Sequence, residues 1–445
     1  MNKRVVIIGA AESGTGAAVL ALKKGYDVFV TDKGKIAGRY KELLQKHKIT
    51  FEEGQHSEEK ILDADEIIKS PGIPDQIYVV QRARLKNIPV ISEIEFAGRY
   101  SKAKMIGITG TNGKTTTTML THHILQKAGL NVGMAGNVGK SFALQVAEND
   151  RDYYVLELSS FQLDGMFRFK CDIAILTNIT PDHLDRYQNQ IKNYVASKFR
   201  ITQNQTGDDT FIYCADDELT NKYKTDFHVK AEQIPFSIKK KLQKGAWLED
   251  DTMNIQTNTN LYTMNIHELA LQGKHNLYNS MAAGIAARVL DLRKDLVRDS
   301  LSDFRSIEHR LEPVSTVHGI EFVNDSKATN VNSTWYALES FHKPVILILG
   351  GVDKGNDYEM LHDLVKEKVK AIVCLGKENK KIIKAFKDVV ETIVETSSAE
   401  EAVNASYRLG KSGDVVLLSP ACASFDMFEN YEDRGRQFKK AVKAL

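Results

Sequence analysis

The chain has 445 residues, of which 42% are hydrophobic, and it carries 60 lysine and arginine residues against 58 aspartate and glutamate residues. This length exceeds what one hydrophobic core usually organises, so two or three domains are expected. The near-neutral balance leaves no basic surface typical of nucleic-acid or anionic-membrane binding.

Two further features indicate a soluble protein of a reducing compartment. No run approaches the roughly 18 consecutive apolar residues that a membrane helix needs, and Glu12 interrupts the apolar stretch after Lys3 and Arg4, so export is not predicted. The four cysteines lack metal-type spacing, and at least two lie in apolar strand-like runs, where they fit small core residues. We expect a cytoplasmic location.

The first predicted domain, residues 1–95, opens like a Rossmann fold. A strand over 4–9 leads through a glycine-containing turn into an alanine-rich helix, and a second strand ends at Asp32, where such folds place an acid near a ribose. Ala11 replaces the middle glycine of the dinucleotide fingerprint, which argues against an NAD site. Either a differently held nucleotide or a purely structural unit fits this pattern.

A second turn of this domain is Ser70-Pro71-Gly72, which follows a strand at 67–70. It lies where the carboxyl edge of a parallel sheet binds ligands, although a tight turn with no ligand is an equal explanation.

The central domain, predicted over 96–306, carries the most specific motif. An apolar strand from Met105 runs into a glycine-rich turn that ends at Gly113-Lys114-Thr115 and opens a helix. Such turns gather backbone amides around a polyphosphate, while the lysine reaches terminal phosphates and the threonine can bind magnesium. Ile108 stands where the strict Walker pattern has its first glycine, so this is a P-loop variant. The alternative is an ordinary strand–turn–helix.

Later post-strand groups can complete a nucleotide site. Glu157 closes the next strand, where a P-loop enzyme needs a carboxylate for magnesium. His183, beside Asp182 and Asp185, can position a second metal or a phosphate, or it can be incidental to a helix cap.

Two other parts of this domain give weaker signals. Asn276 and Asn279 lie one helical turn apart, suited to a base or ribose or simply to a polar helix start. The polar stretch 205–265 is predicted to be a peripheral sheet or insertion.

The third domain, 307–445, is predicted to be a second doubly wound sheet, with strands near 320–325, 344–351, 371–376 and 414–420. Arg310 can donate two hydrogen bonds to a phosphate, or it can pair with a neighbouring glutamate. The loops 324–330 and 420–426 are dense in polar groups at the strand ends, and Lys354 adds a cation there. Hydroxyls with cations suit a dicarboxylate substrate.

Taken in order, these motifs resemble the Mur ligases of peptidoglycan synthesis. The resemblance rests on Gly-Thr-Asn-Gly-Lys-Thr, Glu157-Leu-Ser-Ser-Phe-Gln-Leu, Asp182-His-Leu-Asp-Arg-Tyr, Gly-Lys-His-Asn-Leu-Tyr-Asn, His309-Arg-Leu-Glu and Asn-Asp-Ser-Lys-Ala-Thr-Asn, and it covers all three blocks. The last motif is similar to that of the D-glutamate-adding branch.

The resemblance implies an ATP-dependent amide ligase. The carboxylate of UDP-N-acetylmuramoyl-L-alanine would attack the γ-phosphate of ATP to form an acyl phosphate, and the amine of D-glutamate would displace phosphate. Metal and positioned donors must neutralise the developing charge.

The resemblance also implies roles for individual residues. Catalytic groups would be Lys114, His183 and Lys198, the last being the family's carbamylated lysine, although on its own it would pass as surface charge. ATP would contact Gly110, Thr111, Asn112, Gly113, Lys114, Thr115, Thr116, Asn276, Asn279, Arg310 and Asp325. Two Mg²⁺ sites would use Thr115, Glu157, His183 and Lys198. The UDP-sugar would contact Ser13, Asp32, Ser70, Gly72 and Asn137, and D-glutamate would contact Lys327, Thr329, Lys354, Ser424 and Tyr431.

Other functions remain open on sequence. A sibling ligase would add a different amino acid, whereas an ATP-driven binding switch would need no pocket of hydroxyls and lysines at the third domain's strand ends. An NAD-dependent dehydrogenase is disfavoured by Ala11. We expect a monomer that uses small-molecule substrates.

Overall fold

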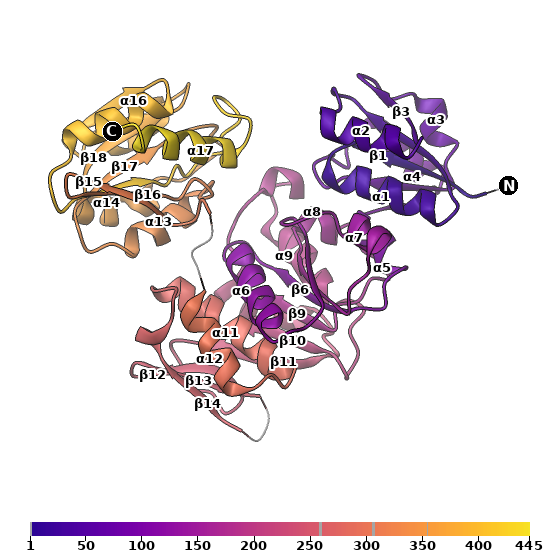
Figure 1. The fold of residues 1–445 in the computed structure, drawn as a ribbon, viewed down its shortest axis with the longest axis horizontal. Coiled ribbons are helices and arrows are strands. Elements are labelled where there is room, and N and C mark those ends of the chain that lie inside the picture. Colours follow the sequence, from indigo (N-terminus) through magenta and orange to yellow (C-terminus); the bar gives the residue numbers. More distant parts are fainter. Residues whose placement is uncertain (1, 258–259, 305–307, 354) are drawn as a thin grey trace. The chain divides into compact units, whose positions relative to one another are not determined.

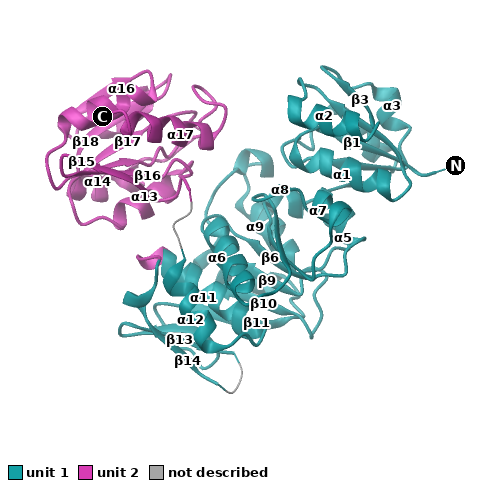
Figure 2. Cartoon of the chain, in the orientation of Figure 1, with its two compact units in different colours: residues 1–270, 276–304 teal, residues 271–275, 305–445 magenta. Residues whose placement is uncertain are grey.

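The computed structural model describes residues 2–257, 260–304, 308–353 and 355–445. Its strands form three sheets (Figure 1). The chain groups into two compact units, Met1–Ala270 with Asn276–Phe304 and Leu271–His275 with Arg305–Leu445 (Figure 2). None of the described helices is long and apolar enough to cross a membrane.

The first sheet is parallel, with the strand order β3-β2-β1-β4-β5. Its central strand β1 is buried because Val5 to Ile8 are apolar on both faces, as expected of a strand covered by helices on each side. The elements are β1 (Arg4–Ile8), α1 (Glu12–Lys23), β2 (Asp27–Asp32), α2 (Gly38–Lys46), β3 (Thr50–Glu53), α3 (Glu58–Leu62), β4 (Glu66–Lys69), α4 (Tyr78–Leu85) and β5 (Val90–Ile91).

Helix α5 (Glu93–Gly98) ties the first sheet to the second through two buried carboxylates. Glu93 accepts hydrogen bonds from the Ser141 hydroxyl at 2.5 Å and the Ala143 amide at 2.9 Å, at the start of α7 (Phe142–Glu148). Glu95 accepts three backbone amides from residues 167–169 at 2.9–3.0 Å. Each carboxylate satisfies amides that would otherwise be buried without partners.

Close helix packing reinforces this junction. A Cβ atom on Gly16 of α1 would lie 1.9 Å from the Ser141 hydroxyl oxygen, so only glycine allows α1 to approach α7 this closely.

The second sheet has nine strands in the order β14-β13-β12-β11-β10-β9-β6-β8-β7. Strands β6 to β12 pair in parallel, and β12 to β14 pair antiparallel. The strands are β6 (Lys104–Thr109), β7 (Val132–Gly136), β8 (Tyr153–Glu157), β9 (Ile173–Leu176), β10 (Thr210–Cys214), β11 (Glu232–Ser237), β12 (Gly245–Glu249), β13 (Thr252–Gln256) and β14 (Tyr262–Asn265). The helices are α6 (Lys114–Lys127), α7, α8 (Ser160–Leu163), α9 (Ile191–Phe199), α10 (Glu218–Tyr223), α11 (Lys274–Val289) and α12 (Lys294–Asp303).

The polar stretch 205–265 therefore forms no separate sheet: it extends the central one. At its far end, α12 covers the edge strand β14. Lys294 Nζ donates to the Leu261 carbonyl at 2.7 Å, and Arg298 Nη2 donates to the Thr263 carbonyl at 2.7 Å.

The third sheet has the order β15-β16-β20-β17-β18-β19, in which β15 alone runs antiparallel to its neighbour. The strands are β15 (Glu312–Val317), β16 (Ile320–Asn324), β17 (Val345–Leu349), β18 (Val369–Leu375), β19 (Ile393–Thr396) and β20 (Val415–Leu418). The helices are α13 (Val331–Glu339), α14 (His362–Lys368), α15 (Lys380–Phe386), α16 (Ala399–Leu409) and α17 (Tyr431–Val442).

The predicted class, α/β with two Rossmann-like sheets around a P-loop sheet, is confirmed. The predicted boundaries at 95/96 and 306/307 stay predictions; the first falls within α5, and the second adjoins residues outside those described. All four cysteines are buried and free, as expected of core residues.

Candidate active site

The P-loop turn joins β6, which lies between β9 and β8 in the central sheet, to α6. Gly113 caps the helix with φ +81°, and Gly110 has φ +145°; both conformations favour glycine. The turn is held from the neighbouring strand end: Asn178 Oδ1 accepts the Asn112 amide at 2.9 Å, and the Thr180 carbonyl accepts the Thr111 hydroxyl at 3.0 Å. A rigid turn with its helix start is thus preformed for an anion.

Two lysines converge on this turn. Lys114 Nζ lies 2.9 Å from the Gly110 carbonyl oxygen, and Lys198 Nζ, from α9, lies 2.7 Å from the same oxygen. Lys198 is only 2% exposed. Its burial, and next the charge of Lys114, lower the pKa of Lys198 well below its usual value. The neutral form of the Lys198 amine is therefore favoured.

Glu157 lies beside the turn because β8 pairs with β6, with Glu157 opposite Ile108. The carboxyl is 1% exposed, and Oε1 accepts the Asn137 side-chain amide at 2.7 Å. Asn137 follows β7 and thus lies beside the strand end of β8, and Ser141, four residues on, reaches α1, where its amide donates to Glu12 Oε1 at 3.1 Å. Thr115, in the first turn of α6, is 3% exposed and adds a hydroxyl oxygen.

Strand β6 pairs with β8 on one side and with β9 on the other, and His183 lies in the loop that follows β9. Its backbone is left-handed with φ +52°, Nε2 lies 3.7 Å from Asp182 Oδ2, and the ring packs edge-on against Phe161. The sheet order therefore brings the loops bearing Gly110, Glu157 and His183 to one edge.

Helix α11 brings Asn279 to the P-loop. Its Oδ1 accepts the Thr117 hydroxyl at 3.2 Å, and its amide donates to Asn276 Oδ1 at 3.4 Å. The two amides share a helix face as predicted. A Cβ on Gly113 would come within 2.4 Å of Asn279 Oδ1.

The first sheet gathers three of the five predicted UDP-sugar residues at its carboxyl edge. Ser13 donates to Ser70 at 3.4 Å, and Ser70 donates to the Gly9 carbonyl at 3.1 Å. The Asp32 carboxylate accepts the amides of Ala10 and Gly34, both at 2.8 Å, and so shapes the turn. Gly72 is exposed two residues past Ser70.

In the third sheet, Asp325 directly follows β16. Its carboxylate accepts the Ser419 hydroxyl at 2.8 Å and the Leu311 amide at 3.2 Å. Burial raises the pKa of Asp325 to about 6, while Arg310 favours its ionised form. Among the described residues, the buried Nε of Arg310 has no hydrogen-bond partner.

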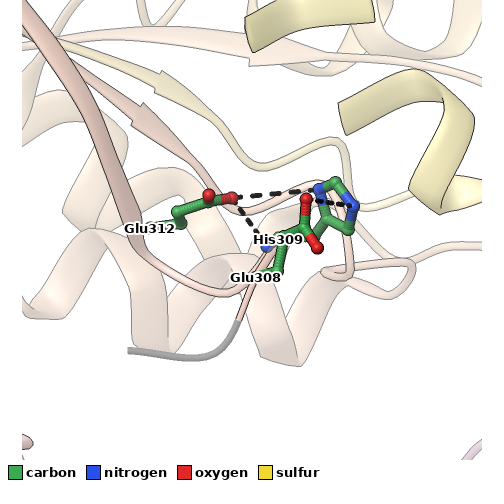
Figure 3. Close-up of side chains that lie close together, drawn as sticks. All are labelled: Glu308, His309 and Glu312. Carbon is green, nitrogen blue, oxygen red and sulfur yellow. Dashed lines mark hydrogen bonds and ion pairs between the residues drawn. The ribbon is translucent and has the colours of Figure 1, made fainter. Parts of the chain in front are cut away.

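Beside the Arg310 loop lie Glu308, His309 and Glu312, close enough together to suggest a metal site (Figure 3). Lys439 Nζ, however, pairs with Glu308 at 2.6 Å and with Glu312 at 2.9 Å. A cation already balances these glutamates, so the group is a structural cluster. Neither glutamate pairs with Arg310, which was the alternative that sequence left open.

The predicted D-glutamate residues lie on strand-end loops of the third sheet. Lys327 Nζ lies 5.3 Å from the centre of the Tyr431 ring, Ser424 is 2% exposed, and Thr329 is half-buried. Lys354 lies outside the described residues.

Arg434, a fully buried arginine of α17, gave no signal in the sequence. Its guanidinium donates to the Ser326 hydroxyl and carbonyl at 3.0 and 2.8 Å, and to the carbonyls of Gly350 and Cys422 at 3.3 and 3.2 Å. One side chain thus holds the loops after β16, β17 and β20.

Three family models match the chain: the MurD N-terminal domain over 4–78, the Mur ligase middle domain over 108–287, and the Mur ligase, glutamate ligase domain over 309–422. The UDP-N-acetylmuramoylalanine–D-glutamate ligase of Christiangramia forsetii is 55% identical over the whole of both chains. The chain belongs to the Mur ligase family. The enzyme of the same name from Salinibacter ruber is 42% identical over 99% of this chain and 98% of its own.

Solved Mur ligases share the fold. The UDP-N-acetylmuramate-alanine ligase MurC of Thermotoga maritima superposes with a TM-score of 0.65 at 19% identity over 99% of both chains. MurF of the same organism, in complex with ADP, gives 0.62 at 14% identity over 100% of this chain and 98% of its own.

Proposed function

We propose that this Mur ligase joins D-glutamate to UDP-N-acetylmuramoyl-L-alanine at the expense of ATP, through an acyl phosphate. The support is full-length identity of 52–55% to ligases so named, together with strand-end residues of the expected kinds on all three sheets. The preformed P-loop turn carries the argument for ATP.

Magnesium fits the polar groups at the P-loop. Thr115, in the first turn of α6, offers a hydroxyl oxygen, and Glu157, at the end of the strand that pairs with β6, offers a buried carboxylate; these are the oxygen donors that this ion prefers. We propose that these two residues hold one ion and that His183 and a carbamylated Lys198 hold a second. Bound magnesium would offset the negative charge of the phosphates and of the attacking carboxylate.

The protein's own groups then explain each step. Lys114 reaches over the turn and can neutralise charge on the γ-phosphate as the substrate carboxylate attacks it. Burial lowers the pKa of Lys198 and so favours the neutral amine, the form that adds CO2 to give a carbamate and a proton. The family's lysine modification thus has a physical basis here.

We propose that Asn276, Asn279, Arg310 and Asp325 contact ATP, and that Ser13, Asp32, Ser70, Gly72 and Asn137 contact the UDP-sugar. Lys327, Thr329, Lys354, Ser424 and Tyr431 would receive D-glutamate, since ammonium and hydroxyl groups complement its two carboxylates. We further propose a monomer acting in the cytoplasm, where ATP and reduced cysteines are available.

The test is phosphate release by the purified protein with magnesium and ATP. Supplied together, UDP-N-acetylmuramoyl-L-alanine and D-glutamate should support release, and omission of either should abolish it. Release supported by L-lysine or L-alanine in place of D-glutamate would identify a sibling activity, and release with no pair would contradict the proposal.

A further inference from the structure

A buried polar network joins two strand-end loops of the third sheet. Strands β17 and β20 are parallel neighbours, and each is followed by a loop: described residues 350–353 and 355–358 after β17, and residues 419–430 after β20. In the second loop Ser424 is 2% exposed, whereas the next residue, Phe425, is 72% exposed. Ser424 therefore lies at the point where the chain emerges from the core.

The backbones of the two loops are paired. Val352 and Ala423 exchange amide–carbonyl hydrogen bonds of 2.8 and 3.2 Å, and the Gly350 amide donates to the Pro420 carbonyl at 3.0 Å. A Cβ atom on Gly351 would lie 2.1 Å from the Ala423 carbonyl oxygen. Ala421 is held at φ +58°, a conformation unfavourable for alanine that the surroundings must enforce.

Side chains of the first loop supply that enforcement. Asn356 Nδ2 donates to the Ala421 carbonyl at 3.1 Å and to the Tyr358 hydroxyl at 3.2 Å. The Tyr358 hydroxyl donates to Asp353 Oδ2 at 3.0 Å, which leaves its oxygen to accept the Cys422 thiol at 3.2 Å. Every donor in this assignment has an acceptor.

Asp353 anchors the network. Its other oxygen, Oδ1, accepts the amides of Gly355 and Asn356 at 2.7 and 3.2 Å and pairs with Lys381 at 3.0 Å. Tyr358 is 5% exposed and Cys422 is 1% exposed, so removing one partner leaves the others unsatisfied within the core.

We propose that Tyr358 and Asn356 are positioning residues for D-glutamate, because they fix Ala421 and Cys422 in the loop that carries Ser424. This inference rests on the proposed function, in which Ser424 contacts that substrate. Both residues lie in the second unit, whereas the P-loop and the first sheet belong to the first. Among the described residues, their hydrogen bonds reach Asp353, Ala421 and Cys422, and not the proposed ATP contacts Arg310 and Asp325. Their loss should therefore act on D-glutamate binding and spare the other two substrates.

The experiment compares Tyr358→Phe and Asn356→Ala with wild type in the phosphate-release assay, with each substrate varied in turn. We expect the KM for D-glutamate to rise about tenfold, the effect of one lost buried hydrogen bond, with KM for ATP and for UDP-N-acetylmuramoyl-L-alanine unchanged. The matched control is Tyr407→Phe, which removes a tyrosine hydroxyl that hydrogen-bonds His318 at 2.7 Å ahead of β16 in the same unit. It should leave all three constants unchanged.

Thermal unfolding of each variant separates positioning from general destabilisation, and Asn356→Ala carries the test if Tyr358→Phe does not fold. An unchanged KM for D-glutamate, or a parallel change in all three constants, would overturn the inference. A wild-type enzyme that needs no D-glutamate would instead overturn the proposed function.

Discussion

Gly113 shows how a single residue sets the geometry of the P-loop. Its φ of +81° is strained for any other residue, and it also leaves room for the Asn279 side chain. Glycine is therefore favoured at position 113 for two reasons, the positive φ and the lack of room for a Cβ atom. A second glycine in the same unit has only the first of these features. Gly129 has φ +76°, but nothing lies within 4 Å of a Cβ built on it.

We expect Gly113→Ala to lower kcat/KM for ATP at least about tenfold, since about 1–2 kcal/mol of backbone strain is joined by a 2.4 Å contact with Asn279. Gly129→Ala should meet the strain alone and keep its activity. Steady-state assays at varied ATP concentration check this, and equal losses in the two variants would contradict the role given to Asn279.

At the scale of elements, helix α5 carries a buried acid that makes folding depend on pH. Burial raises the pKa of Glu93 to about 7, although hydrogen bonds from Ser141 and Ala143 favour its ionised form and Glu12 opposes it. Between pH about 4.5 and about 7 the native carboxyl holds a proton that the unfolded one has lost. Stability should thus fall as the pH rises through this window.

We expect Glu93→Gln to remove this dependence, changing the variant-minus-wild-type free energy of unfolding by about 3 kcal/mol between pH 4.5 and 7.5. Urea unfolding at the two pH values measures it. The exposed Glu59→Gln variant serves as control and should follow wild type. A wild-type slope that persists in Glu93→Gln would show that other groups cause it.

Motifs of adjacent residues were enough to predict strands, helices and the P-loop, whereas side-chain contacts between residues far apart in the sequence were not predicted. The P-loop was visible because its glycines, lysine and threonine are adjacent in sequence. Arg434 binds Ser326 from 108 residues away, and Asn356 binds Ala421 from 65 residues away, so neither gave a local pattern. The contact of Asn137 with the UDP-sugar stays a prediction, and its hydrogen bond to Glu157, 20 residues away, likewise gave no local pattern. Lys198 was found only by resemblance, since its burial depends on tertiary packing.

At the scale of the molecule, the edge of the central sheet bears on the proposed monomer. An open edge strand is a template for pairing with another chain. Lys294 occupies the backbone carbonyl of Leu261, directly before β14, and Arg298 that of Thr263 within β14, carbonyls that such a partner would use. The side chains of α12 thus cover the sheet's last strand.

We expect the wild-type protein to run as one species of 49.9 kDa in light scattering, and the double variant Lys294→Glu, Arg298→Glu to form larger species as concentration rises. Exchanging Lys240 and Lys241, exposed lysines after β11, for glutamate matches the charge change and should leave the mass unchanged. A wild-type dimer would contradict the proposed monomer.

The burial of all four cysteines has a practical consequence for spectroscopy. Burial raises the pKa of each thiol, so few thiolates are present to react with maleimides or nitroxide reagents near neutral pH. The native cysteines should therefore take up little label. One cysteine introduced at Leu85 of the first unit and another at Asp388 of the second, both strongly exposed, would carry a probe pair without removal of native thiols. The distance between the probes would then report how the two units move as each substrate is added.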